Sequence, residues 1–204
     1  MFVSFEGIDG CGKTTQLRLL AAWLERRGHR VVVTREPGGT ALAEGVRALI
    51  LHPAAPLAPG TELLLFGAAR AQHVAEIVRP ALETGAWVLS DRFADSSLAY
   101  QGAGLGLDPE FIAAMNRFAT GALEPDLTLL FDLEPATGAR RRAGVREDQI
   151  EARGLEFQTR VRARYLELAA SAPERFRLID AAPDPATVAE AVTGAVEAWL
   201  AAGA

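Results

Sequence analysis

The chain has 204 residues, and half of them are hydrophobic, which is enough to bury the core of one large domain. The net charge of −5 disfavours a nucleic-acid duplex as ligand, and no apolar run reaches the length of a membrane span. Met1 leads into a strand-like segment without a basic signal region, and the single cysteine, Cys11, excludes an internal disulfide. We therefore expect a cytoplasmic protein that binds neither membranes nor nucleic acid.

Strand-like apolar runs alternate with helical patterns along the chain. Strands are predicted at 2–7, 31–35, 87–91, 127–132 and 176–179. Helices are predicted at 14–27, 41–51, 62–83, 109–120, 135–142, 151–170 and 185–201. Loops are predicted at 52–60, which holds three prolines, and at the glycine-rich segment 102–106. This alternation is typical of an α/β domain with a parallel sheet covered on both faces, and we predict one domain spanning 1–204.

The first predicted strand runs into a Walker A pattern, Gly7-Ile8-Asp9-Gly10-Cys11-Gly12-Lys13-Thr14. Its glycines bring backbone N–H groups around phosphate oxygens, and the following helix directs its positive end at them. Lys13 is predicted to reach the β- and γ-phosphates of a nucleoside triphosphate, and the Thr14 hydroxyl to ligate Mg²⁺. A turn that merely joins strand to helix is the alternative. The apolar strand before the motif and the amphipathic helix after it favour the phosphate site.

Lys13 is also the only lysine, since the other 20 of the 21 basic residues are arginine. The excess of arginine is compatible with a GC-rich genome or with adaptation to heat, and the sequence does not separate the two. Under either explanation, the one lysine that remains stands at the position where a phosphate site requires a lysine.

Asp9 is unusual inside such a loop, because a carboxylate beside a triphosphate costs free energy unless it points away. We predict that it contacts a hydroxyl of the phosphoryl acceptor, with a turn-forming Asp as the alternative. Cys11 is predicted to be a packing residue.

Charged residues also stand at the ends of two other predicted strands. Ligands of parallel sheets bind beyond the carboxyl ends of the strands, where Arg35 and the pair Asp91-Arg92 fall. Asp91 is predicted to hold a water on Mg²⁺, and Arg92 to clamp a phosphate. The structural alternatives are an Asp–Arg pair that caps the sheet and a plain turn after Arg35. Two arginines on adjacent strand ends nevertheless favour a second anionic group beside the triphosphate.

Two further patterns each have two interpretations. Phe66 and Arg70 share one helix face, which suits a base that stacks and presents a carbonyl, although a core Phe with a surface Arg is the commoner meaning of this spacing. Segment 140–153, rich in arginine and acidic residues, is either a solvated helix face or a mobile lid over a nucleotide. No histidine cluster is visible, so catalysis is expected to rest on positioning and charge neutralisation.

Taken together, these motifs resemble the bacterial thymidylate kinases (dTMP kinases) of the P-loop nucleoside monophosphate kinase family. The resemblance runs over nearly the whole chain and is carried by FEGIDGCGKTTQ (5–16), TREPGGT (34–40), DRFADSSLAYQG (91–102) and RVRARYLELA (160–169). It implies a P-loop NTPase fold with a five-stranded parallel sheet, helices on both faces and a small lid at about 135–153. It also implies a homodimer and phosphorylation of dTMP to dTDP by ATP with Mg²⁺, a step towards dTTP.

The resemblance also implies roles for individual residues. Asp9 would contact the 3′-hydroxyl of dTMP, while Arg35 and Arg92 would hold its phosphate. Thymine would stack on Phe66 and accept from Arg70, and base and sugar would be lined by Ser97, Tyr100 and Gln101. Some members of the family carry an arginine where this chain has Gly10, so the cation at the γ-phosphate is expected from the lid arginines. Among Arg140, Arg141, Arg142 and Arg146 the register is ambiguous. We assign the catalytic role to Arg142 and Arg146, together with Lys13 and Arg92.

Two other functions remain as alternatives. A kinase for another nucleoside monophosphate or for a deoxynucleoside would use the same phosphate sites. A P-loop switch that binds GTP is disfavoured, because its Asn-Lys-x-Asp motif would need a second lysine.

Overall fold

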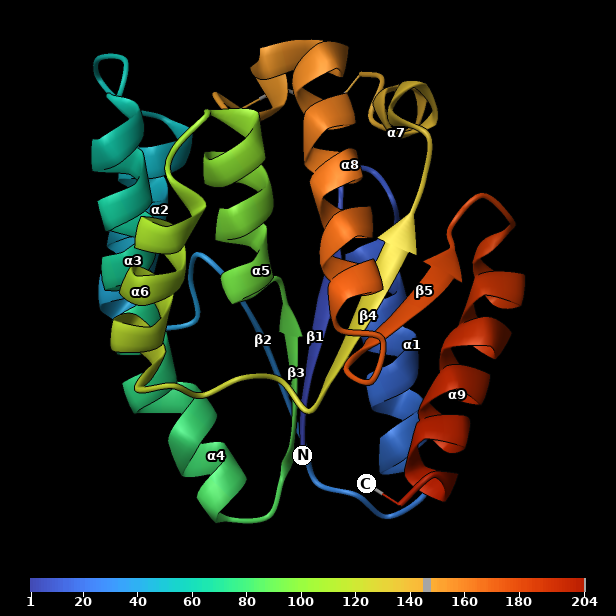
Figure 1. Ribbon diagram of the computed structural model, residues 1–204. Coiled ribbons are helices and arrows are strands. Elements are labelled where there is room, and N and C mark those ends of the chain that lie inside the picture. The colour runs from blue at the N-terminus through green and yellow to red at the C-terminus, as the bar shows by residue number, and fades with distance from the viewer. Residues whose placement is uncertain (145–147, 204) are drawn as a thin grey trace.

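The computed structural model describes residues 1–144 and 148–203 (Figure 1). It contains one five-stranded parallel sheet with the strand order β2-β3-β1-β4-β5. The strands are β1 (Phe2–Gly7), β2 (Val31–Arg35), β3 (Trp87–Asp91), β4 (Leu127–Asp132) and β5 (Phe176–Asp180). All five predicted strands and their parallel arrangement are confirmed, with β5 one residue longer than expected. The central strand, β1, is buried along its whole length, as a strand covered on both faces should be.

Helices cover both faces of this sheet (Figure 1). They are α1 (Lys13–Glu25), α2 (Ala41–Leu51), α3 (Pro59–His73), α4 (Arg79–Glu83), α5 (Ala94–Ser97), α6 (Pro109–Thr120), α7 (Pro135–Arg141), α8 (Gly154–Ser171) and α9 (Pro185–Ala201). Helices α1 and α9 pack together on one face, whereas α5 and α8 lie against the other. Among the described residues, no helix is both long and apolar enough to cross a bilayer.

The helix predicted at 62–83 is divided in the structure. It begins earlier, at Pro59, which occupies the first helical turn, where a missing N–H costs nothing. The predicted loop at 52–60 therefore ends before Pro59. A wider, π-helical turn at Val74–Val78 then separates α3 from α4. Pro80 explains this turn, because its ring cannot donate a hydrogen bond and collides with the carbonyl one turn earlier in a regular helix.

The predicted loop at 102–106 is wrong in its first half. Residues Leu98–Gly104 form a π-helical segment that continues α5, and the turn begins only after Gly104. The glycines here permit close packing, since a Cβ on Gly104 would lie 2.5 Å from the ring of Phe157 in α8. Composition alone suggested a flexible loop, whereas the glycines let two helical segments approach each other.

The segment between β4 and α8 is only partly helical. Helix α7 ends at Arg141, a single 3₁₀ turn spans Glu151–Arg153, and α8 starts at Gly154. The first predicted helix of this region is thus one residue shorter, and the second is divided between a 3₁₀ turn and α8. These elements stand above the carboxyl ends of the strands, at the top of Figure 1.

Candidate active site

The loop between β1 and α1 has the backbone that a phosphate-binding loop requires. Gly7, Gly10 and Gly12 have φ values of 140°, 80° and 92°, in a region that side chains rarely adopt. Helix α1 begins at Lys13, so the positive end of its dipole faces the loop. The Lys13 ammonium donates to the carbonyl oxygens of Gly7 at 3.1 Å and Ile8 at 2.9 Å. The loop therefore brings backbone amides and one ammonium group together in a single turn.

Gly10 is also fixed by its neighbour in α7. A Cβ on Gly10 would lie 2.5 Å from the carbonyl oxygen of Gly138, and a Cβ on Gly138 would lie equally close to the carbonyl oxygen of Asp9. This contact leaves no space for a side chain at position 10. The structure thus gives a steric reason for a glycine at position 10.

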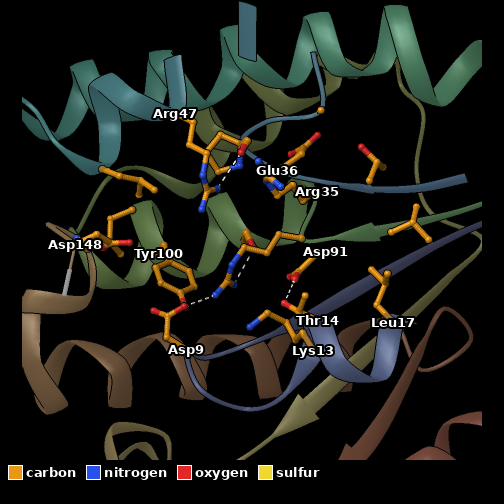
Figure 2. Close-up of a pocket in the computed structure, with 18 of the residues that line it drawn as sticks. Asp9, Lys13, Thr14, Leu17, Arg35, Glu36, Arg47, Asp91, Tyr100 and Asp148 are labelled. Carbon is orange, nitrogen blue, oxygen red and sulfur yellow. Dashed lines mark hydrogen bonds and ion pairs between the residues drawn. The ribbon is translucent and has the colours of Figure 1, made fainter. Parts of the chain in front are cut away.

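Thr14 and Asp91 meet at the end of the sheet. The Thr14 hydroxyl donates to the Asp91 carboxylate at 2.5 Å, and Figure 2 shows this contact beside Lys13. Both side chains offer oxygen atoms, the ligands that Mg²⁺ prefers, and both lie next to the phosphate-binding loop. The pair therefore fits a Mg²⁺ site. The sequence placed these residues 77 positions apart, and the fold brings them into contact.

Arg92 is the most connected cation of the site. Its guanidinium donates to the Gly7 carbonyl at 2.9 Å, to the Asp9 carboxylate at 2.5 Å and to the Tyr100 hydroxyl at 2.9 Å. Its backbone has a φ of 75°, which is strained for a residue with a side chain. Such strain persists only where the surroundings over-determine it, and here it turns the side chain back over the phosphate-binding loop.

Asp9 is held from two sides. One carboxylate oxygen accepts from Arg92, and the other accepts from the Gln158 amide at 2.9 Å. Burial alone raises the pKa of Asp9, but the charges of Arg92 and Lys13 outweigh it, and the pKa lies below its usual 3.8. Asp9 is therefore an ionised acceptor at neutral pH. Its neighbour Cys11 is buried, as expected for a packing residue.

Glu6 is a buried carboxylate that the sequence analysis missed. It accepts from the Phe93 backbone N–H at 2.7 Å, from the Ser96 hydroxyl at 2.6 Å and from the Tyr165 hydroxyl at 2.7 Å. Ser96 and Tyr165 in turn lie 3.3 Å from the Arg92 guanidinium. Glu6 thus supports the strained turn that carries Arg92. Burial and the charge of Asp95 raise the pKa of Glu6 from 4.5 to about 7.

This raised pKa predicts a pH-dependent stability that Glu6→Gln abolishes. Between pH 4.5 and about 7 the folded protein retains on Glu6 a proton that the unfolded chain releases. The contribution of Glu6 to the free energy of unfolding is therefore fully present below pH 4.5 and is lost as the pH rises through 7. Glutamine does not titrate. From pH 5 to pH 8 the variant is expected to gain roughly 2 kcal/mol relative to the wild type in free energy of unfolding. Urea titrations at both pH values measure it, and a constant difference would contradict the prediction.

A cavity of about 790 Å³ opens between these residues. Asp9, Lys13 and Thr14 lie along one side of it, and Arg35 and Glu36 face them from the other (Figure 2). The Arg35 guanidinium is half-exposed and pairs with Glu44 at 2.7 Å. Arg92 also lines the cavity, but its guanidinium is bonded to Gly7 and Asp9 and therefore stands beside the phosphate-binding loop, whereas Arg35 stands across from it (Figure 2). The size and polarity of the cavity suit a nucleotide.

Of the residues predicted at the base, Phe66, Tyr100 and Gln101 line this cavity. Arg70 and Ser97 do not. Arg70 is almost fully buried and donates to Glu36, Ser97, Asn116 and the Phe93 carbonyl. These bonds use four of its five N–H groups, and only the fifth remains for a ligand. Ser96, rather than Ser97, reaches the cavity wall.

The arginines that were predicted to belong to a lid lie in different environments. Arg142 pairs with Glu151 at 2.9 Å and is close enough to Asp9 to help lower its pKa. Arg141 lines the cavity and donates to the carbonyl oxygens of Ala181 and Ala182, both at 2.9 Å. Arg146 lies outside the described residues.

Helix α8 contributes residues that the sequence analysis did not assign. Gln158 and Tyr165 are buried on the same stripe as Val161 and contact Asp9 and Glu6. Polar side chains within the buried stripe of an amphipathic helix are a signal that could have revealed them, because a buried amide or hydroxyl needs a partner.

Comparisons with known proteins agree on one family. A family model described as thymidylate kinase matches residues 5–192. The chain is 52% identical over 201 residues to a thymidylate kinase of Bifidobacterium longum, covering 97% of this chain and 95% of that protein. It is 50% identical over 203 residues to that of Gloeobacter violaceus, covering 98% and 96%. A crystal structure of the thymidylate kinase from Ehrlichia chaffeensis superposes with a TM-score of 0.81 at 37% identity, covering 97% and 98%. The chain therefore belongs to the thymidylate kinase family.

Proposed function

We propose that this protein transfers the γ-phosphoryl group of ATP to dTMP, with Mg²⁺, and releases ADP and dTDP. The observation that carries the proposal is a single cavity that a phosphate-binding loop lines together with Arg35, Arg92 and the ring of Phe66. Such a site holds two phosphate groups with their ends toward each other. The family of the chain supports thymine as the base of the acceptor.

The donor phosphates would lie on the backbone amides of the loop. Lys13 then turns its ammonium from the Gly7 and Ile8 carbonyls toward the β- and γ-phosphates. Thr14 and the water-binding carboxylate of Asp91 would hold Mg²⁺, which neutralises phosphate charge when bound. These groups belong to the phosphate-binding loop, the start of α1 and the end of β3, so once the nucleotide is bound little reorganisation is needed at the moment of transfer.

The acceptor phosphate would lie against Arg35 and Arg92. Its oxygen is already anionic, so it attacks the γ-phosphorus without a general base, and the enzyme supplies alignment and positive charge. Phe66 is proposed to stack on thymine, with Arg70 donating to a carbonyl through its remaining N–H. Asp9 is proposed to accept from the 3′-hydroxyl, while Tyr100 and Gln101 surround base and sugar. Ser97, predicted with them, is proposed to act from behind the cavity wall through its hydrogen bond with Arg70.

We propose that residues 135–153 form the lid of this site. Arg142 and Arg146 would bring positive charge to the γ-phosphate as the lid closes. Exclusion of water would then limit futile hydrolysis of ATP. A cytoplasmic location stays a prediction.

A panel of acceptors tests the proposed function. Release of ADP is measured with ATP, Mg²⁺ and each nucleoside monophosphate or deoxynucleoside in turn. We expect dTMP to give the highest kcat/KM among the nucleotides with a base other than uracil. A clear preference for dAMP, dCMP or a deoxynucleoside would replace the proposed reaction with one of its alternatives.

We further propose that the chain forms a homodimer through helices α2, α3 and α6. These helices lie side by side on the left of Figure 1. They leave large apolar side chains more than half exposed: Leu42, Leu49, Leu64, Phe111 and Phe118. An apolar face of this kind is rare on a monomer and typical of an interface.

Phe118→Arg is predicted to weaken or abolish this dimer. Phe118 is 90% exposed in the single chain, so a charge there costs nothing until a second copy covers it. Sedimentation equilibrium is expected to show a dimer for the wild type and a dissociation constant at least about tenfold higher for the variant. Leu178→Arg, on the edge strand β5, serves as the control at an exposed leucine outside the proposed interface. A monomeric wild type contradicts the proposal.

A further inference from the structure

Glu62 is a buried carboxylate in the first turn of α3 that the proposed reaction does not use. Its oxygen Oε1 accepts from the Gln101 amide nitrogen at 2.9 Å and from Arg153 at 3.1 Å. Its other oxygen accepts from the second terminal nitrogen of Arg153. Glu62 thus joins a residue of the cavity wall to the 3₁₀ turn at Glu151–Arg153.

The charge of Glu62 determines how the Gln101 amide is turned. An ionised carboxylate accepts hydrogen bonds and has no proton to donate, so Gln101 has to present its NH₂ group to Glu62. The carbonyl oxygen of Gln101 is then the atom left for the cavity. Within the described part of the chain, no hydrogen bond to this oxygen competes with a ligand.

Arg153 keeps the carboxylate in this role. Its guanidinium reaches both oxygens of Glu62 and supplies the opposite charge that a buried carboxylate needs. Arg153 itself also lies over the ring of Phe157, with its guanidinium carbon 5.1 Å from the ring centroid. The orientation of Gln101 is therefore set by three elements, α3, the 3₁₀ turn and the segment after α5.

We propose that Glu62 is a positioning residue that sets the nucleobase specificity of this enzyme through Gln101. A carbonyl oxygen aimed into the cavity accepts an N–H from the base. Thymine and uracil carry an N–H at ring position 3, whereas cytosine has a lone pair there, and two acceptors that face each other repel. Glu62 therefore selects against dCMP and does not separate thymine from uracil. This inference rests on the proposed function, because it takes Gln101 to lie along the edge of the base.

The test compares kcat and KM for dTMP and dCMP in the wild type and in Glu62→Gln. A neutral amide at position 62 can either accept or donate, so the Gln101 amide can turn over. The ratio of kcat/KM for dTMP over dCMP is expected to fall roughly tenfold to hundredfold, with the change for dTMP mainly in KM. If Glu62 had a purely structural role, kcat/KM would fall equally for dTMP and dCMP and their ratio would stay unchanged. That result would overturn the inference.

Two further variants keep the test decisive. In Gln101→Leu the amide that Glu62 is proposed to orient is absent. If Glu62 acts only through Gln101, adding Glu62→Gln to this variant is expected to cause no further fall in the dTMP-over-dCMP ratio of kcat/KM. The double variant Glu62→Gln with Arg153→Gln removes both charges of the pair and allows the measurement if the single variant unfolds. A wild type that does not phosphorylate dTMP refutes the proposed function itself. A wild type that prefers dTMP and keeps its ratio in Glu62→Gln refutes only the role of Glu62.

Discussion

Arg92→Ala is expected to lower kcat/KM for dTMP by at least about 10³-fold while the protein stays folded. The reason is the number of groups that one guanidinium organises. It bonds to Gly7 in the phosphate-binding loop, to Asp9 and to Tyr100, and it faces the cavity. Removing it deletes the cation proposed for the acceptor phosphate and leaves the buried Asp9 carboxylate without its nearest counter-charge.

Two companion variants separate charge from geometry. Arg92→Lys keeps the positive charge but cannot form the same fork of hydrogen bonds, so an intermediate loss is expected. Arg164→Ala removes an arginine whose only described ion pair is with Glu167 on the surface of α8, and it should retain activity. Circular dichroism melting curves check the fold of all three. Near-full turnover by Arg92→Ala would refute the role assigned to it.

The sheet could be predicted from the sequence because its signals are local. Each strand is a short apolar run closed by a polar or glycine residue, and the structure reproduces all five within one residue. The predicted starts of the helices at Pro109 and Pro185 are confirmed, and the structure adds their caps: the Asp108 and Asp184 carboxylates accept from backbone N–H groups of the first turns. Where Pro80 or the glycines at 102 and 104 modify a helix, the local pattern misled, because only the packing decides their effect.

The contents of the site could be predicted only where a motif names them. Thr14 and Asp91 were both assigned to Mg²⁺ from the sequence. The structure shows that they are hydrogen-bonded to each other, and their role at the metal stays a prediction. Glu6 was not identified, because a single acidic residue at the end of a buried strand gives no sign of what lies across from it. Its partners Ser96 and Tyr165 are 90 and 159 residues away.

Arg70 also shows what a sequence motif cannot reveal about a site residue. Its spacing from Phe66 places both on one helix face, but spacing does not reveal how many of its N–H groups are already used. The structure shows that Glu36, Ser97, Asn116 and a backbone carbonyl take four of them. A buried arginine with so many partners organises the wall behind the cavity as well as whatever its last N–H contacts.

Lys13→Ala is expected to lower kcat by at least about 10³-fold while leaving the affinity for dTMP nearly unchanged. The ammonium lies at the phosphate-binding loop, bonded to the Gly7 and Ile8 carbonyls, whereas the acceptor phosphate is proposed to lie against two other cations, Arg35 and Arg92. Loss of Lys13 should therefore act on the donor side alone. Calorimetric titration with dTMP measures acceptor binding separately from turnover.

The single lysine makes a second test possible. Because the other basic side chains are all arginines, a reagent that acylates primary amines can modify only Lys13 and the N-terminus. Lys13 is nearly buried, so slow inactivation is expected, with ATP protecting and dTMP alone giving little protection. Peptide mass spectrometry identifies the modified amine. Equal protection by dTMP, or a Lys13→Ala variant that turns over within tenfold of the wild type, would show that the ammonium does not contact the donor phosphates.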